Sequence, residues 1–110
     1  MIEPSTSFKD NLAQLPPPDE LARIDLLDAT GKIVGIIENA PGKQGSLVVY
    51  RYLHEQFGQL GPASARHGLV VFAEHTADAR QHPGAHPNID RLLTIAEGGE
   101  PLEIRLVPAA

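Results

Sequence analysis

Apolar residues recur every three to four positions in several segments, which is the spacing of a helix that packs one face against a core. The clearest such segments are 8–15, 47–57 and 88–96. Ser46 and Asn88 stand where a side chain commonly caps the start of a helix, so we expect them to be N-caps. Weaker helical patterns cover 62–67 and 76–81. The pattern therefore predicts three or four short helices.

Strand patterns alternate with these helices. Residues 23–38 predict a β-hairpin that turns at Thr30-Gly31-Lys32. Its second half, 33–38, is apolar on both faces apart from one glycine, which favours a central place in the sheet or a bulge. The apolar run 69–74 predicts a buried strand, and the alternation in 102–106 predicts a half-exposed one.

Taken together, these elements predict an α+β fold of one domain over residues 1–110. We expect a mixed sheet of about four strands with the helices packed mainly on one face. Residues 1–6 and 108–110 are expected to be frayed ends. The order of the strands does not follow from the sequence.

Composition removes several classes of function. The chain has no cysteine, which excludes disulfides, zinc fingers, iron–sulfur clusters and thiol nucleophiles, so any metal must be held by histidine and carboxylates. Nine basic residues against fourteen acidic ones, with no cationic stripe, argue against binding nucleic acid or a membrane surface. No run approaches the ~20 apolar residues of a membrane span, and the first residues lack the pattern of a signal peptide, so we expect a cytoplasmic protein.

A glycine-containing loop at 39–46 is the first candidate site. A strand, then a loop with glycines, then a capped helix is an arrangement that holds anions, because loop amides and the helix start present partial positive charge. Gly42 and Gly45 would permit close approach, while Lys43 and Ser46 would contact the anion. The loop lacks the spacing of a nucleotide-hydrolysing phosphate loop. A plain helix entry with solvated Lys43 is the alternative.

A histidine-rich segment at 74–90 is the second candidate site, and it holds three of the five histidines. Proton transfer is one interpretation, in which His75, His82 or His86 acts as general acid or base and is oriented by Glu74, Asp78 or Asp90. His75 and Asp78 are the first choice for the catalytic residues. Arg80 would add a cation for a ligand. Another interpretation is a divalent metal site, because imidazole and carboxylate groups suit zinc, manganese, iron or nickel. Its ligands would be His75, Asp78, His82, His86 and Asp90.

A purely structural role is the third interpretation of this segment, since histidines also tie down surface loops. Elsewhere in the chain, Tyr50 is expected in the core. His54 lies on the apolar face of its helix and is expected to be a half-buried, hydrogen-bonded residue. His67, beside Gly68, is expected to be solvated.

Three segments of the chain carry a resemblance: SFKDNLAQLP at 7–16, IENAPGKQGSLVVY at 37–50 and AEHTADARQHPGAHPNIDRLL at 73–93. Together they resemble a bacterial family known as domain of unknown function 2322. The resemblance implies a single-domain bacterial protein and carries no activity, cofactor or catalytic residue. It places both candidate sites within the family's pattern.

The leading hypothesis is therefore a small bacterial protein that binds a compact anionic ligand, such as a phosphorylated one, between the 39–46 loop and the 74–90 segment. Whether it is an enzyme stays open. A metal-dependent enzyme using the histidine and aspartate cluster is one alternative, and a divalent metal is the only cofactor that the residues suggest. A non-catalytic homodimer that pairs through a strand edge or a helix face is the other.

Overall fold

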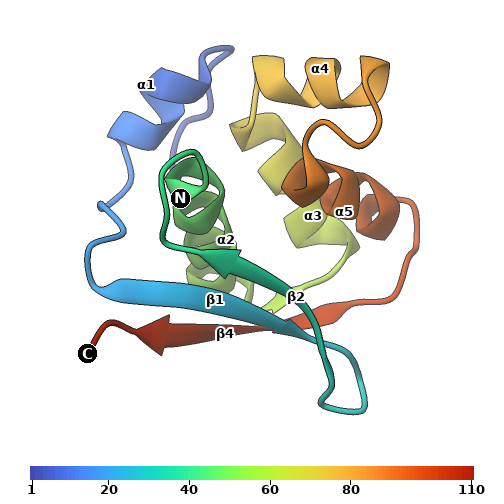
Figure 1. The fold of residues 1–110 in the computed structure, drawn as a ribbon. Coiled ribbons are helices and arrows are strands. Elements are labelled where there is room, and N and C mark those ends of the chain that lie inside the picture. The colour runs from blue at the N-terminus through green and yellow to red at the C-terminus, as the bar shows by residue number, and fades with distance from the viewer.

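The computed structural model describes residues 1–110 and confirms an α+β fold (Figure 1). Four strands form one sheet in the order β2-β1-β4-β3, and every pairing is antiparallel. The strands are β1 (Leu21–Leu27), β2 (Ile33–Glu38), β3 (Gln59–Leu60) and β4 (Leu102–Pro108). The helices are α1 (Phe8–Ala13), α2 (Gln44–Phe57), α3 (Pro62–Val71), α4 (Glu74–Gln81) and α5 (Pro87–Ala96).

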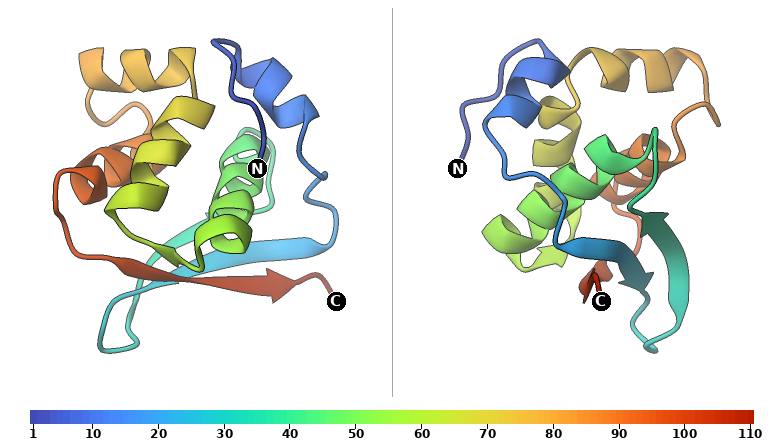
Figure 2. Two further views of the ribbon diagram at one scale, coloured as in Figure 1. Left: turned by 180° about the vertical axis from the view of Figure 1, so that it is seen from behind. Right: turned by 60° about the vertical axis from the view of Figure 1, so that its left-hand side comes forward.

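All five helices lie on one side of the sheet, as the two further views make plain (Figure 2). The core between these layers is one cluster of 19 buried apolar residues. Helix α2 is buried from Leu47 to Leu53, and both of these leucines are fully buried in the core. Strand β1 contributes Ile24 and Leu26 to the same core. None of the helices combines the length and the apolar character that a membrane crossing needs.

The predicted hairpin is confirmed, because β1 and β2 pair from Arg23 with Glu38 to Leu27 with Ile33. Its turn is fixed by Asp28, whose Oδ1 accepts hydrogen bonds from the N–H groups of Thr30 (2.9 Å) and Lys32 (3.0 Å). Gly31 follows with φ +85°, a conformation that glycine adopts without strain.

The predicted strand at 69–74 and the predicted mixed sheet were wrong. Residues 69–71 end α3, and 69–74 contains no strand, so the fourth strand is the short β3 and the sheet is antiparallel rather than mixed. A short apolar run fits a buried helix as well as a buried strand, and the packing of α3 against α2 and α5 decides for the helix. Of the two alternatives for 33–38, the central place is wrong, since β2 lies at the edge of the sheet, whereas the bulge is present, because the register shifts between Leu26 and Leu27.

The N-terminal residues lie against the body of the protein. The N–H of Ile2 donates to the Tyr52 hydroxyl (3.3 Å), and the N–H of Ser5 donates to Oδ1 of Asn11 (2.7 Å). Asn11 is fully buried and donates from Nδ2 to the carbonyl oxygens of Ser5 (3.1 Å) and Val71 (2.9 Å). A single amide thus joins the N-terminal segment, α1 and the end of α3.

His67 is not simply solvated, contrary to the sequence expectation. Its Nε2 lies 2.6 Å from the Tyr52 hydroxyl, and its ring packs against Tyr52 and Phe57 at centroid distances of 5.4 and 5.7 Å. Burial, followed by the nearby N-terminal ammonium, lowers the pKa of His67 below the ordinary value of 6.5. His54 lies half-buried, and its Nδ1 is enclosed without a hydrogen-bond partner.

This pKa shift predicts a pH dependence of stability. The folded pKa of His67 is lower than the unfolded one, so the unfolded state takes up a proton at a higher pH than the folded state does. The contribution of His67 to the free energy of unfolding is therefore fully present above pH 6.5 and is lost as the pH falls through 6.5 toward the folded pKa. We expect His67→Gln, which keeps a polar group near Tyr52, to lose less free energy of unfolding than the wild type between pH 7.5 and pH 5.5. Urea unfolding at both pH values measures this. Equal losses in the two proteins would show that His67 is not the titrating group.

Candidate functional site

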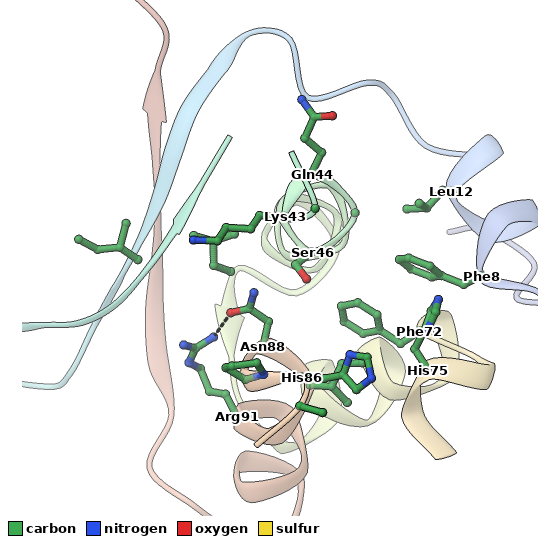
Figure 3. Close-up of a pocket in the computed structure, with 17 residues that line it drawn as sticks. Phe8, Leu12, Lys43, Gln44, Ser46, Phe72, His75, His86, Asn88 and Arg91 are labelled. Atoms are coloured by element: carbon green, nitrogen blue, oxygen red, sulfur yellow. Dashed lines mark hydrogen bonds between the residues drawn. The ribbon is translucent and has the colours of Figure 1, made fainter. Parts of the chain in front are cut away.

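The two candidate segments meet in one pocket. A cavity of about 680 Å³ is lined by the start of α2, the loop before α5, the first turn of α5 and parts of α1 and β2 (Figure 3). It is lined by Phe8, Leu12, Ile36, Ile37, Gly42, Lys43, Gln44, Gly45, Ser46, Phe72, His75, Ala85, His86, Pro87, Asn88, Ile89 and Arg91. Its volume lies within the range of small-molecule sites.

The start of α2 forms one wall. Gly42, with φ +82°, turns the chain, and Lys43 is the N-cap residue, so Ser46 lies inside the first turn instead of capping it as predicted. The N–H groups of Gln44, Gly45 and Ser46 donate to no group within the chain. Such free N–H groups give a helix start its partial positive charge. No acidic residue in the first turn offsets that charge.

The start of α5 forms the facing wall and brings in Arg91, which the sequence analysis missed. Nη1 of Arg91 donates to Oδ1 of Asn88 (2.9 Å, dashed in Figure 3) and to the Tyr50 hydroxyl (3.1 Å). Tyr50 is fully buried and donates in turn to the Asn88 carbonyl oxygen (2.6 Å). Burial raises the pKa of Tyr50 to about 12, so its hydroxyl stays protonated and holds the guanidinium in place.

Gly35 of β2 lies directly beside the arginine. A Cβ atom at this position would lie 3.0 Å from Nη2 of Arg91, so a larger residue would require the guanidinium to shift. Gly45 has a similar explanation that differs from the predicted one. A Cβ there would meet the Phe8 ring at 3.1 Å, so the missing side chain makes room for Phe8.

The charge of the pocket is opposite to that of the chain. The protein carries fourteen acidic residues and a net charge of -5, yet no aspartate or glutamate lines the pocket. Lys43 and Arg91 both line it, and neither forms an ion pair with another residue. The start of α2, with its free N–H groups, and two cations without ion-pair partners therefore face one acid-free cavity.

The far end of the pocket is apolar. The rings of Phe8 and Phe72 stack at a centroid distance of 5.1 Å, and His75 meets Phe8 edge-on at the same distance. Figure 3 shows this group across the cavity from Arg91 and Lys43. A ligand that fills the cavity would thus meet cations at one end and rings at the other.

The predicted catalytic pair of His75 and Asp78 is not formed. Asp78 instead contacts Nε2 of His86 through Oδ2 (2.6 Å) and Nδ1 of His82 through Oδ1 (3.2 Å). The hydrogen bond from His86 is the main cause of the lowered pKa of Asp78. His86 lines the pocket, so the imidazole that a carboxylate orients there is His86.

The predicted metal ligands are not brought together either. Oδ2 of Asp90 accepts a hydrogen bond from the N–H of Gly84 (2.9 Å) and so holds the 82–86 loop. The ring of His75 lies 5.9 Å from that of His86 and packs among aromatic side chains. No group of three or more histidine, aspartate or glutamate side chains is arranged to hold a metal ion. Pro83 and Gly84 bend the chain after α4, which ends the helical spacing that the prediction used.

The remaining predicted residues divide clearly. Gly42, Lys43, Gly45 and Ser46 all line the pocket, whereas Arg80 is exposed on α4 and does not. Asn88 was expected to cap α5 but lies inside its first turn, because the helix begins at Pro87. Arg91 follows Asn88 by one helical turn, and that spacing was the one sequence signal that could have drawn attention to it.

Comparison with known proteins gives a family and no function. A family model described as "Uncharacterized protein conserved in bacteria (DUF2322)" matches residues 8–106. No curated protein and no solved structure matches the chain.

Proposed function

The chain belongs to this uncharacterised bacterial family, and from its pocket we propose that it binds a small anionic ligand between α2 and α5. The observation that carries the proposal is the acid-free cavity faced by two cations without ion-pair partners, Lys43 and Arg91. In a chain of net charge -5, such a cavity would offer a negative group charge-assisted hydrogen bonds without repulsion from a lining carboxylate.

The geometry favours a phosphate or carboxylate group. The free N–H groups of Gln44, Gly45 and Ser46 would bind its oxygens as helix starts commonly do. Arg91 is already oriented by Asn88 and Tyr50, so it would lose little conformational freedom on binding. The rings at the far end would contact an apolar part of the same ligand, and we therefore expect phenyl phosphate to bind more tightly than inorganic phosphate.

Thermal unfolding in the presence of inorganic phosphate, sulfate and phenyl phosphate tests this function. A ligand at 100 times its dissociation constant adds about 2.7 kcal/mol to the free energy of unfolding, so a saturable rise in Tm is expected. We expect Lys43→Met and Arg91→Met each to weaken binding by roughly 10- to 100-fold, because each removes a charged hydrogen-bond donor. Isothermal titration calorimetry gives the affinities.

Arg80→Met is the matched control, since it removes the same charge from an exposed position outside the pocket. It should leave the affinity unchanged. Two results would contradict the proposal: no rise in Tm with any of the three anions, or a rise that the pocket variants and the control reduce equally. The second result would indicate general charge effects.

A further inference from the structure

The outer edge of the sheet at β2 is long, apolar and open. Three of the five exposed large apolar residues of the chain lie on this strand: Ile33, Val34 and Ile36, with exposed fractions of 44%, 48% and 50%. The opposite edge, β3, is only two residues long. Figure 1 shows β2 at the free side of the sheet, where no helix or strand covers it.

The backbone of β2 also has free hydrogen-bonding groups. The N–H of Asn39 donates to the carbonyl oxygen of Ala22 on β1 (3.0 Å). Bonding groups alternate between the two sides of an antiparallel strand, so Ile37 faces β1 whereas the N–H groups of Ile36 and Glu38 face away from it. Natural proteins usually protect such an edge with proline, inward charges or short length, because it can pair with another chain. On β2 the edge is interrupted only by a bulge near one end of the strand, where the register with β1 shifts between Leu26 and Leu27.

We propose that β2 pairs with β2 of a second copy of this chain, antiparallel and centred on Ile36, to form a two-fold symmetric dimer. Ile36 would then lie opposite Ile36 of the second copy, which covers the most exposed apolar side chain of the strand. The two sheets would join into one of eight strands, a size common in folded proteins. Ile36 also lines the anion pocket, and Gly35 lies beside Arg91, so the dimer surface borders the pocket. The inference rests on the strand edge and its charges, and it does not depend on the proposed function.

Charge decides the direction of the pairing. Lys32 precedes β2 and Glu38 ends it, and both are exposed. In the antiparallel arrangement Glu38 is a diagonal neighbour of Lys32 of the second copy at both ends of the interface, within reach of long side chains. A parallel pairing in register would set lysine beside lysine and glutamate beside glutamate. The strand is therefore complementary in charge to an antiparallel copy of itself.

Sedimentation velocity over a range of concentrations tests the dimer. We expect the wild type to reach twice the chain mass of 11.8 kDa and Ile36→Lys to sediment as a monomer, because two lysines would then face each other. Val70→Lys is the matched control, since Val70 is 56% exposed on α3, away from β2, and it should still dimerise. Circular dichroism confirms that each variant is folded. A wild type that stays monomeric up to millimolar concentration, or an Ile36→Lys variant that still dimerises, overturns the proposal.

Charge reversal tests the direction. Lys32→Glu and Glu38→Lys should each raise the dimer dissociation constant by roughly 2- to 30-fold, because each places like charges together at both ends of the interface. The double variant Lys32→Glu/Glu38→Lys should return toward the wild-type value. A double variant that dimerises no better than the single ones would overturn the antiparallel register.

Discussion

Replacing Gly68 by valine is expected to lower the free energy of unfolding by about 3 kcal/mol, because this glycine lies where three helices meet. A Cβ atom at position 68 would come within 2.9 Å of Cδ1 of both Leu53 on α2 and Leu92 on α5. Both leucines are fully buried, so neither can move aside without disturbing the core. Domains of this size have about 5–15 kcal/mol of stability in total, which makes the loss easy to measure by urea unfolding.

Ala63→Val is the matched control for this substitution. Ala63 is exposed on the same helix, so valine there adds side-chain volume without meeting the core. We expect it to change the free energy of unfolding by less than about 0.7 kcal/mol, the range of ordinary helix propensity. If Gly68→Val cost no more than Ala63→Val, the close packing of α2, α3 and α5 would be refuted.

Asn11→Leu is expected to cost about 2–3 kcal/mol, although leucine has the same branched side-chain skeleton and is apolar. The side chain of Asn11 is fully buried and bonds to Ser5 and to the carbonyl oxygen of Val71, 60 residues away. Leucine would leave the buried Val71 carbonyl without a partner, and an unsatisfied buried group carries its full desolvation cost. Hydrogen exchange should also show faster exchange of the Ser5 N–H, which would lose its acceptor.

Gln14→Leu separates this effect from the loss of any amide. Gln14 also links α1 to the N-terminal segment, accepting from the N–H of Glu3 (3.2 Å) and donating to its carbonyl oxygen (3.0 Å). It is exposed, so water can replace both bonds, and we expect a change within about 0.5 kcal/mol. Equal costs for the two variants would mean that burial of Asn11 does not determine its role.

Half of the candidate site could be predicted from sequence. The loop with Gly42, Lys43 and Ser46 was identified because a strand, glycines and a helix start follow one another directly in the chain. Arg91 could not be identified in this way, because its position depends on a hydrogen bond to Tyr50, which lies 41 residues earlier in the chain. The pairing of Asp78 with His86 was one of several that the sequence left open, because it depends on how Pro83 and Gly84 bend the chain between them.

The sequence by itself determined the elements whose signals are local. Ser7 caps α1 by accepting from the N–H of Asp10, Gly58 ends α2 with φ +84°, and the alternation at 102–106 lies within β4. These features depend on backbone preferences and on side chains a few residues apart, which a single segment contains.

Only the tertiary structure decided whether 69–71 is helix or strand, where β2 lies in the sheet, and which side chains share the pocket. An apolar run is buried equally well in either conformation, so the packing of α3 against α2 and α5 settles it. The pocket likewise needs the start of α2 to meet the start of α5. Their contact is fixed by hydrogen bonds between residues about 40 positions apart, and no local pattern along the chain records such a contact.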